Sequence, residues 1–136
     1  MKRFVSAFIC VIMLLFTLCS CGSEPIYGLS EGCYMLNITS DTYPSPTIDF
    51  DLEDNTFTFN YDVLSSYLAH GTFRISGGKV IAKTYDGKYT YIFEITDNDT
   101  ITFIQNGSSE IKITDAPDSF RVPQVFDGAE FKFLEE

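Results

Sequence analysis

The chain has 136 residues, of which 45% are hydrophobic, 15% aromatic and 21% charged, and its formal net charge is -10. This length allows one domain, and the apolar content excludes an intrinsically disordered chain. The 19 acidic against 9 basic residues exclude a nucleic-acid binder, because phosphate contacts require clustered Lys and Arg. The 4 cysteines are too few for a disulfide scaffold.

The N-terminus has the organisation of a secretory signal. Met1-Lys2-Arg3 precedes an uncharged apolar run from Phe4 to Leu18, and a short positive segment before such a run is typical of signal peptides. The run is shorter than the roughly 20 residues that a transmembrane helix requires. Residues 1–20 are therefore predicted to be a signal peptide that forms a helix in the membrane.

The end of the apolar run resembles a bacterial lipobox. In Leu18-Cys19-Ser20-Cys21 an aliphatic residue and two small residues precede a cysteine. The resemblance implies that Cys21 is acylated and becomes the first residue of the mature chain. Two or more acyl chains hold a protein durably on a membrane, whereas a single chain binds only marginally. Plain secretion and a retained membrane helix are the alternatives.

Removal of the signal peptide changes the charge and the thiol content of the protein. Loss of Lys2 and Arg3 makes the net charge of the mature chain more negative, so anionic lipid head groups repel it and the acyl chains must provide the anchoring. Residues 21–28 are predicted to be a short tether, roughly 20 Å long if extended. Cys33 then remains as a lone thiol, for which a small buried core residue is the expected role. The predicted location is the extracytoplasmic face of the cell membrane.

Residues 29–136 are predicted to form a single β domain, because apolar and polar residues alternate with a period of two. The segment from Val63 to Leu68 lacks this alternation and is predicted to be a helical turn or short helix. Strands are predicted at residues 33–38, 48–52, 56–61, 72–76, 79–85, 88–96, 100–105, 110–114 and 129–134.

Turn residues separate these strands. Gly77-Gly78 and Asp86-Gly87 are predicted to be two-residue hairpin turns. Polar clusters at residues 53–55, 97–99 and 106–107 are predicted to be further turns.

The predicted fold is an antiparallel meander of eight or nine short strands, closed as a lipocalin-like barrel, with a two-sheet sandwich as the alternative. Large aromatic side chains can supply the core of such a domain without disulfides. The residues expected to face inward are Phe57, Phe59, Tyr61, Phe73, Ile75, Tyr89, Tyr91, Phe93, Ile95, Ile101, Phe103, Phe131 and Phe133.

Several segments between residues 64 and 131 carry a resemblance to known proteins. They include Leu64-Ser65-Ser66-Tyr67-Leu68, Thr84-Tyr85-Asp86-Gly87-Lys88-Tyr89 and Asp127-Gly128-Ala129-Glu130-Phe131. They resemble small, poorly characterised lipoproteins of clostridia-type bacteria and the extracellular tail module of some BlaR1-like membrane proteins of the M56 family. The resemblance implies an extracytoplasmic accessory or sensory module. The peptidase chemistry of that family does not carry over, because its His-Glu-x-x-His motif needs two histidines and the chain has one.

No catalytic, metal-binding or cofactor-binding residues are predicted, and the protein is expected not to be an enzyme. His70, the only histidine, is expected to be solvated at a loop-to-strand junction. The acidic residues between Asp49 and Asp54 lack the Gly and Glu positions of an EF-hand loop, and a solvated strand face is expected there. The serine pairs at 65–66 and 108–109 lie outside any Gly-x-Ser-x-Gly motif.

Two functions remain after these exclusions. The first is a non-enzymatic interaction or sensory module, anchored to the membrane through acyl chains on Cys21 and binding a protein or envelope partner. The alternative is a lipocalin-like binder of a small apolar ligand in the barrel interior. The sequence identifies neither the partner nor the ligand.

Overall fold

The computed structural model describes residues 28–38, 44–114 and 123–135. The predicted signal peptide and Cys21 lie outside these ranges. Within them, no helix has the length and apolar character needed to cross a bilayer. The strands are β1 (Gly32–Leu36), β2 (Thr47–Asp51), β3 (Thr56–Asn60), β4 (Ala69–Ser76), β5 (Lys79–Thr84), β6 (Thr90–Asp97), β7 (Thr100–Ile104) and β8 (Glu130–Phe133).

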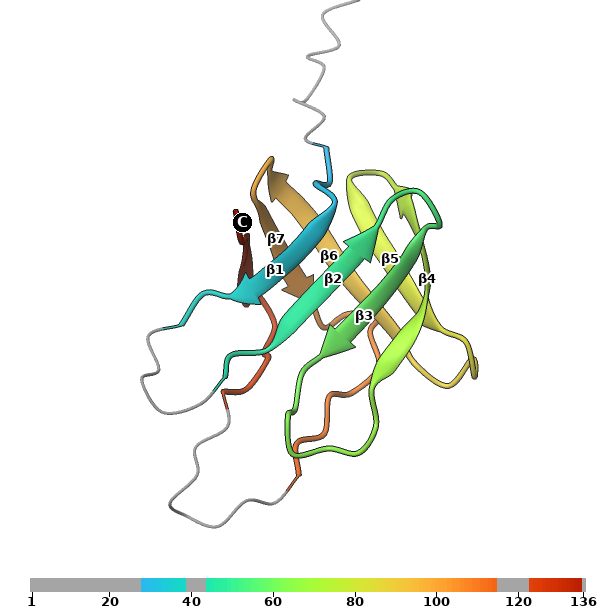
Figure 1. The fold of residues 1–136 in the computed structure, drawn as a ribbon, viewed down its shortest axis with the longest axis vertical. Coiled ribbons are helices and arrows are strands. Elements are labelled where there is room, and N and C mark those ends of the chain that lie inside the picture. Colours follow the sequence, from blue (N-terminus) through green and yellow to red (C-terminus); the bar gives the residue numbers. More distant parts are fainter. Residues whose placement is uncertain (1–27, 39–43, 115–122, 136) are drawn as a thin grey trace, which may run out of the picture.

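The strands form one closed antiparallel barrel (Figure 1). Each strand pairs with its neighbour in sequence, and β8 pairs with β1, with Leu36 opposite Phe131 and Tyr34 opposite Phe133. This closure leaves no unpaired sheet edge. The prediction of an all-β, lipocalin-like meander barrel is confirmed, and the two-sheet sandwich is excluded.

The two ends of the barrel carry connections of different length. The antiparallel order places the turns 52–55, 77–78 and 98–99 at the end where the chain enters at Gly28 and where β8 ends. We call this the turn end. The opposite end, which we call the loop end, carries the connections 37–46, 61–68, 85–89 and 105–129. Short turns therefore lie beside the N-terminal entry and long connections lie away from it (Figure 1).

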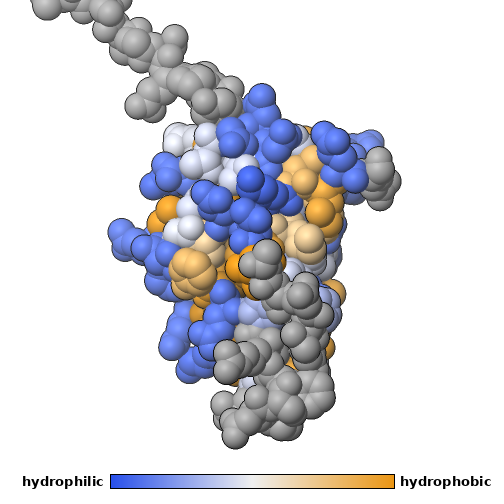
Figure 2. All heavy atoms as spheres, turned by 90° about the vertical axis from the view of Figure 1, so that its left-hand side faces the viewer, coloured by the Kyte–Doolittle hydropathy of each residue, from blue (hydrophilic) through white to orange (hydrophobic). Residues whose placement is uncertain are grey.

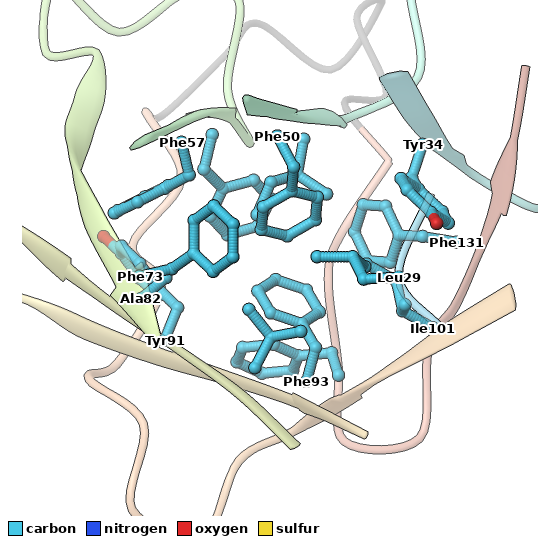
Figure 3. Close-up of a cluster of buried hydrophobic side chains, with 14 of the residues drawn as sticks. Leu29, Tyr34, Phe50, Phe57, Phe73, Ala82, Tyr91, Phe93, Ile101 and Phe131 are labelled. Carbon is cyan, nitrogen blue, oxygen red and sulfur yellow. The ribbon is translucent and has the colours of Figure 1, made fainter. Parts of the chain in front are cut away.

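Aromatic rings fill the interior of the barrel. The ring of Phe59 is surrounded by those of Tyr61, Tyr91, Phe93 and Phe131, at centroid distances of 5.4, 5.1, 5.6 and 6.0 Å. Edge-to-face contacts of this kind are the favoured geometry for aromatic pairs. Figure 3 shows Tyr91, Phe93 and Phe131 pointing into the same interior. The barrel thus has a packed aromatic core.

The predicted inward face is largely confirmed, with one error. Ile75 is 50% exposed, because it lies at the rim of the turn end, next to the Gly77-Gly78 turn. Tyr89 and Phe133 are half-buried and pack against the core. The other predicted residues are buried, together with further core residues at Leu29, Tyr34, Leu36, Ile48, Phe50, Ala69, Val80, Ala82 and Ala129.

Two predicted elements differ in the described chain. Residues 63–68 form one turn, closed by the Ser65 amide donating to the Asp62 carbonyl at 3.1 Å, and the rest is irregular, so the predicted turn is present and the short helix is not. The Asp62 carboxylate also accepts a hydrogen bond from the Leu64 amide at 2.9 Å. Residues 110–114 form no strand, because the neighbouring positions of the barrel are already occupied by β6, β7 and β8. The barrel accordingly has eight strands and not nine.

The two predicted glycine turns differ in the structure. Gly77 and Gly78 both have positive φ, of 58° and 71°, and join β4 to β5 in two residues as predicted. The Asp86-Gly87 prediction is wrong in its length, because residues 85–89 join β5 to β6 and only Gly87 has positive φ there. The Thr84 hydroxyl donates to the Asp86 carboxylate at 2.6 Å and accepts from the Tyr89 amide at 3.1 Å, which stabilises the longer loop.

Candidate functional site

A row of polar side chains crosses the outer face of the barrel from β1 to β4. The strand register places Cys33 opposite Asp49, Asp49 opposite Thr58, and Thr58 opposite His70. Since neighbouring strands lie about 4.8 Å apart, three strand spacings separate Cys33 from His70 by roughly 14 Å. The thiol and the imidazole are therefore too far apart for a hydrogen-bonded nucleophile–base pair.

Cys33 differs from its predicted position in the core. It is half-buried and lies beside Asp49 on the outer face, because its neighbour Tyr34 occupies the inward position of β1. Burial, and then the charge and hydrogen bonding of Asp49, raise the pKa of the Cys33 thiol to about 11. The thiol is thus protonated at neutral pH, which makes it a poor nucleophile.

Alkylation of Cys33 should reveal this environment. In a Cys21→Ser variant lacking the signal peptide, Cys33 is the only thiol, and its rate of reaction with iodoacetamide should rise with a midpoint near pH 11. Asp49→Asn removes the nearby negative charge and should lower that midpoint. Asp99→Asn, which lies at the turn end, is the matched control. A midpoint near the ordinary thiol value in the parent would contradict the placement of Cys33 beside Asp49.

His70 is held in one orientation by β3. Its Nδ1 lies 2.9 Å from the Phe57 carbonyl oxygen and 3.1 Å from Thr58 Oγ1. A carbonyl can only accept, so Nδ1 carries the proton and Nε2 is the acceptor in the neutral ring. The ring also packs edge-on against Tyr85, at a centroid distance of 5.0 Å. His70 is exposed, as expected, but it lies within β4 and has defined partners.

An open depression of about 420 Å³ lies over β1, β2 and β3 near the turn end. The side chains of Glu31, Asp49, Asp51, Thr56 and Thr58 line it. Within the described ranges, no three His, Cys, Asp or Glu side chains are arranged to hold a metal ion. The depression is therefore an acidic surface feature, consistent with the predicted solvated strand face.

Asp51 has a structural role at the edge of this depression. Its Oδ1 accepts hydrogen bonds from the amides of Glu53 and Asp54, at 2.9 and 3.0 Å. Asn55 completes the turn with a positive φ of 54°, a conformation that Asn tolerates better than most residues. The predicted turn at residues 53–55 is confirmed, and Asp51 stabilises it.

In the described chain, exposed large apolar side chains are more numerous at the loop end than at the turn end, which carries Leu52, Ile75 and Leu134. Side chains that are at least one-third exposed project there from three connections, namely Val63, Leu64, Leu68, Tyr85 and Phe126. Apolar residues also appear as patches among hydrophilic ones on the face shown in Figure 2. These exposed apolar side chains are available for contact with another molecule.

Contacts between two connections organise this surface. The Tyr67 hydroxyl donates to the Asp86 carboxylate at 3.2 Å, and its ring packs edge-on against Tyr89 at 5.2 Å. Lys88 lies 3.8 Å from the same carboxylate. The loops 61–68 and 85–89 therefore form one ordered surface.

Side chains from the connecting segments pack against the core at both ends of the barrel. At the turn end Leu29 is buried in the core (Figure 3), and the Ser30 amide donates to the Tyr34 hydroxyl at 2.8 Å. At the loop end Ile111 packs against the core from the segment after β7. The connecting segments thus contribute apolar side chains to the core at each end.

Sequence reasoning missed the polar residues that organise the loop end. Asp62 is 4% exposed and its Oδ2 accepts from the Thr114 amide at 2.7 Å. Ser108 and Ser109, considered only as nucleophiles, accept hydrogen bonds from β6. The position of Asp62, directly after the alternating segment 56–61, is typical of a turn. Nothing local in the sequence indicates that its carboxylate binds Thr114, which is 52 residues away.

No protein family model matches this sequence, and no match was found among curated proteins or among solved structures. The resemblance to clostridia-type lipoproteins and to BlaR1-like tail modules stays a prediction.

Proposed function

We propose that the protein is an extracytoplasmic lipoprotein, anchored through Cys21, that acts as a non-enzymatic interaction or sensory module. The observation that carries the proposal is the arrangement of the closed barrel. Its interior is occupied by aromatic side chains, its N-terminal entry lies at the turn end, and its long connections lie at the loop end. A filled interior favours recognition through the outer surface over binding inside.

The position of the entry determines which surface is available to a partner. An anchor at Cys21 is seven residues before Gly28, so the turn end would face the membrane at a distance of at most about 25 Å. The loop end would then point into the extracytoplasmic space. The exposed side chains Leu68 and Tyr85 and the ordered Tyr67–Asp86 contact lie on that end. We propose this surface as the binding site for a protein or envelope partner.

Replacement of the acylated cysteine tests the anchor. Cys21→Ala removes the acylation site, so the covalent mass of the purified protein should no longer include acyl chains. Cys19→Ala is the matched control and should leave the acyl chains in place. A parent protein whose covalent mass lacks acyl chains, or acyl chains that persist in Cys21→Ala, would contradict the lipoprotein assignment.

A lipocalin-like binder of a small apolar ligand is the second candidate. It is favoured by a group of phenol rings near the loop-end mouth, where Tyr91 lies 6.1 Å from Tyr61 and 6.4 Å from Tyr89 between ring centroids. A ligand there would have to displace side chains that now contact one another. Retention of a small molecule by the native protein would favour this candidate.

A further inference from the structure

Three neighbouring strands of the barrel carry no carboxylate. β3, β4 and β5 contain no Asp or Glu, although the chain has 19 acidic residues. The adjoining strands carry Asp49 and Asp51 on β2, and Glu94 and Asp97 on β6. We call the outer surface of β4 and β5, together with Tyr85 directly after β5, the basic face. These two strands lie side by side on one flank of the barrel (Figure 1), where an anionic molecule meets less repulsion than over β2.

Three exposed cations on the basic face form no salt bridge within the described ranges. They are Arg74, Lys79 and Lys83. The salt bridges found there, with N···O distances of 3.7 and 3.8 Å, are formed by lysines outside the strands. Glu94 lies opposite Lys79 in the strand register without forming a salt bridge to it. The guanidinium and the two ammonium groups are therefore available for charge-assisted hydrogen bonds to an external carboxylate or phosphate.

The outward side chains of the basic face follow one another at regular intervals. Along β5 every second residue points outward, and Tyr85 continues this alternation after the strand ends. Two residues of an antiparallel strand span about 6.8 Å. The strand register places Arg74 opposite Ile81, so the order along the face is Tyr85, Lys83, Arg74 and Lys79. One aromatic ring and three cations are thus distributed over roughly 20 Å.

The ring of Tyr85 is exposed but held in place. It is 62% exposed, and it packs edge-on against His70 at a centroid distance of 5.0 Å. The Tyr85 amide donates to the His70 carbonyl at 3.1 Å, and the imidazole of His70 is itself fixed by the Phe57 carbonyl at 2.9 Å. A ring that is already ordered loses little entropy when a ligand binds. The negative face of an aromatic ring attracts the partially positive C–H groups of a sugar ring, so Tyr85 is suited to stack against a sugar.

We propose that the basic face binds a linear acidic glycan, with one sugar ring stacked on Tyr85 and carboxylate groups at Lys83, Arg74 and Lys79. A chain of sugars can follow β5, because the ring and the cations succeed one another along the strand. The site begins at Tyr85 on the loop end and extends along the flank of the barrel. The inference deepens the proposed interaction function by naming the class of partner, and it rests on that function for the extracytoplasmic location.

Fluorescence anisotropy of labelled oligosaccharides tests the face on the mature protein in a nonionic detergent. A polygalacturonate oligomer should bind, and its affinity should fall as salt is added, because salt screens the contacts between exposed charges. A dextran oligomer of the same length is uncharged and should bind more weakly. Arg74→Gln combined with Lys83→Gln should weaken polygalacturonate binding by roughly fivefold or more. Lys112→Gln combined with Lys132→Gln removes the same charge outside the face and is the matched control, which should bind like the parent.

Tyr85→Ala tests the stacking contact independently of charge. It should weaken binding of the polygalacturonate oligomer by roughly threefold or more and leave the salt dependence unchanged. Phe126→Ala removes another exposed ring at the loop end and is the matched control, which should keep the parental affinity.

Three results would overturn the inference. The first is a polygalacturonate oligomer that does not bind, and the second is equal weakening in the double variant of the face and in its double control. The third is tighter binding of a thymidine oligonucleotide with the same number of charges, because a single-stranded nucleic acid also combines stacking with ionic contacts. These measurements are made in solution and do not require the Cys21 anchor, which the covalent mass of the same sample reports separately. A protein that binds no glycan would leave a protein partner for the proposed function.

Discussion

Phe59→Ala is expected to lower the free energy of unfolding by about 3–5 kcal/mol, the usual cost of removing a buried ring. Phe59 is 0% exposed, and its ring contacts four other aromatic rings, which come from the residue directly after β3, from β6 and from β8. The substitution would leave a cavity that rigid neighbouring strands cannot fill by moving inward. Urea unfolding monitored by tyrosine fluorescence, with circular dichroism as a second probe, measures the effect.

Phe126→Ala is the matched control for this prediction. Phe126 is 59% exposed on the loop end, and surface substitutions of this kind change stability by about 0.5 kcal/mol or less. A loss below about 1.5 kcal/mol for Phe59→Ala would be smaller than a close-packed site allows. That result would indicate an interior with free space and would support the lipocalin-like binder over the interaction module.

Gly71→Ala is expected to destabilise the barrel by at least about 3 kcal/mol or to prevent folding. Gly71 is paired with Thr84 across β4 and β5. A Cβ atom at Gly71 would lie 2.0 Å from the Lys83 carbonyl oxygen and 2.7 Å from Thr84 Cα. Both obstacles are backbone atoms, so no side-chain rotation can relieve the clash, and the two strands would have to separate.

Gly28→Ala is the control for this second substitution, because a Cβ atom at Gly28 meets nothing within 4 Å. It should change the free energy of unfolding by less than about 1 kcal/mol. Both variants should be compared with the parent by urea unfolding and by their yield of folded protein. Parental stability of Gly71→Ala would mean that β4 and β5 do not approach each other as closely as described.

The sequence was most informative where the structural signal is local. Alternation in Thr56-Phe57-Thr58-Phe59-Asn60 predicts β3 and its inward face, since successive strand side chains point to opposite sides. The Gly77-Gly78 turn was also predictable, because glycine adopts the positive φ angles of both turn positions without steric cost. These signals together were sufficient for an all-β meander.

Features that depend on the detailed contacts of distant partners could not be predicted. Closure of the barrel was predicted, but the register of β8 against β1 was not, because their residues are about 100 positions apart in the chain. Residues 110–114 alternate like a strand but find no open edge in a barrel that is already closed. Leu29 was missed because it precedes the first alternating segment and becomes buried only when the barrel forms around it.

The candidate site was predicted less well than the fold. Cys33 and His70 were considered because of their side-chain chemistry alone. The strand register places them apart on the outer face. Asp62 and the Tyr67–Asp86 contact depend on which connections meet at the loop end. These contacts join segments in which apolar and polar residues do not alternate. In such segments a single sequence does not indicate which residues lie close together.

Mass spectrometry of the protein extracted from its own membranes in mild detergent tests the central claim most directly. The denatured chain gives the covalent mass, and the native ion reports any retained small molecule. We expect a chain that begins at an acylated Cys21 and a native ion without a small-molecule adduct. A covalent mass that still includes residues 1–20 would contradict the lipoprotein anchor, and a stoichiometric apolar adduct would contradict the interaction module with a filled barrel.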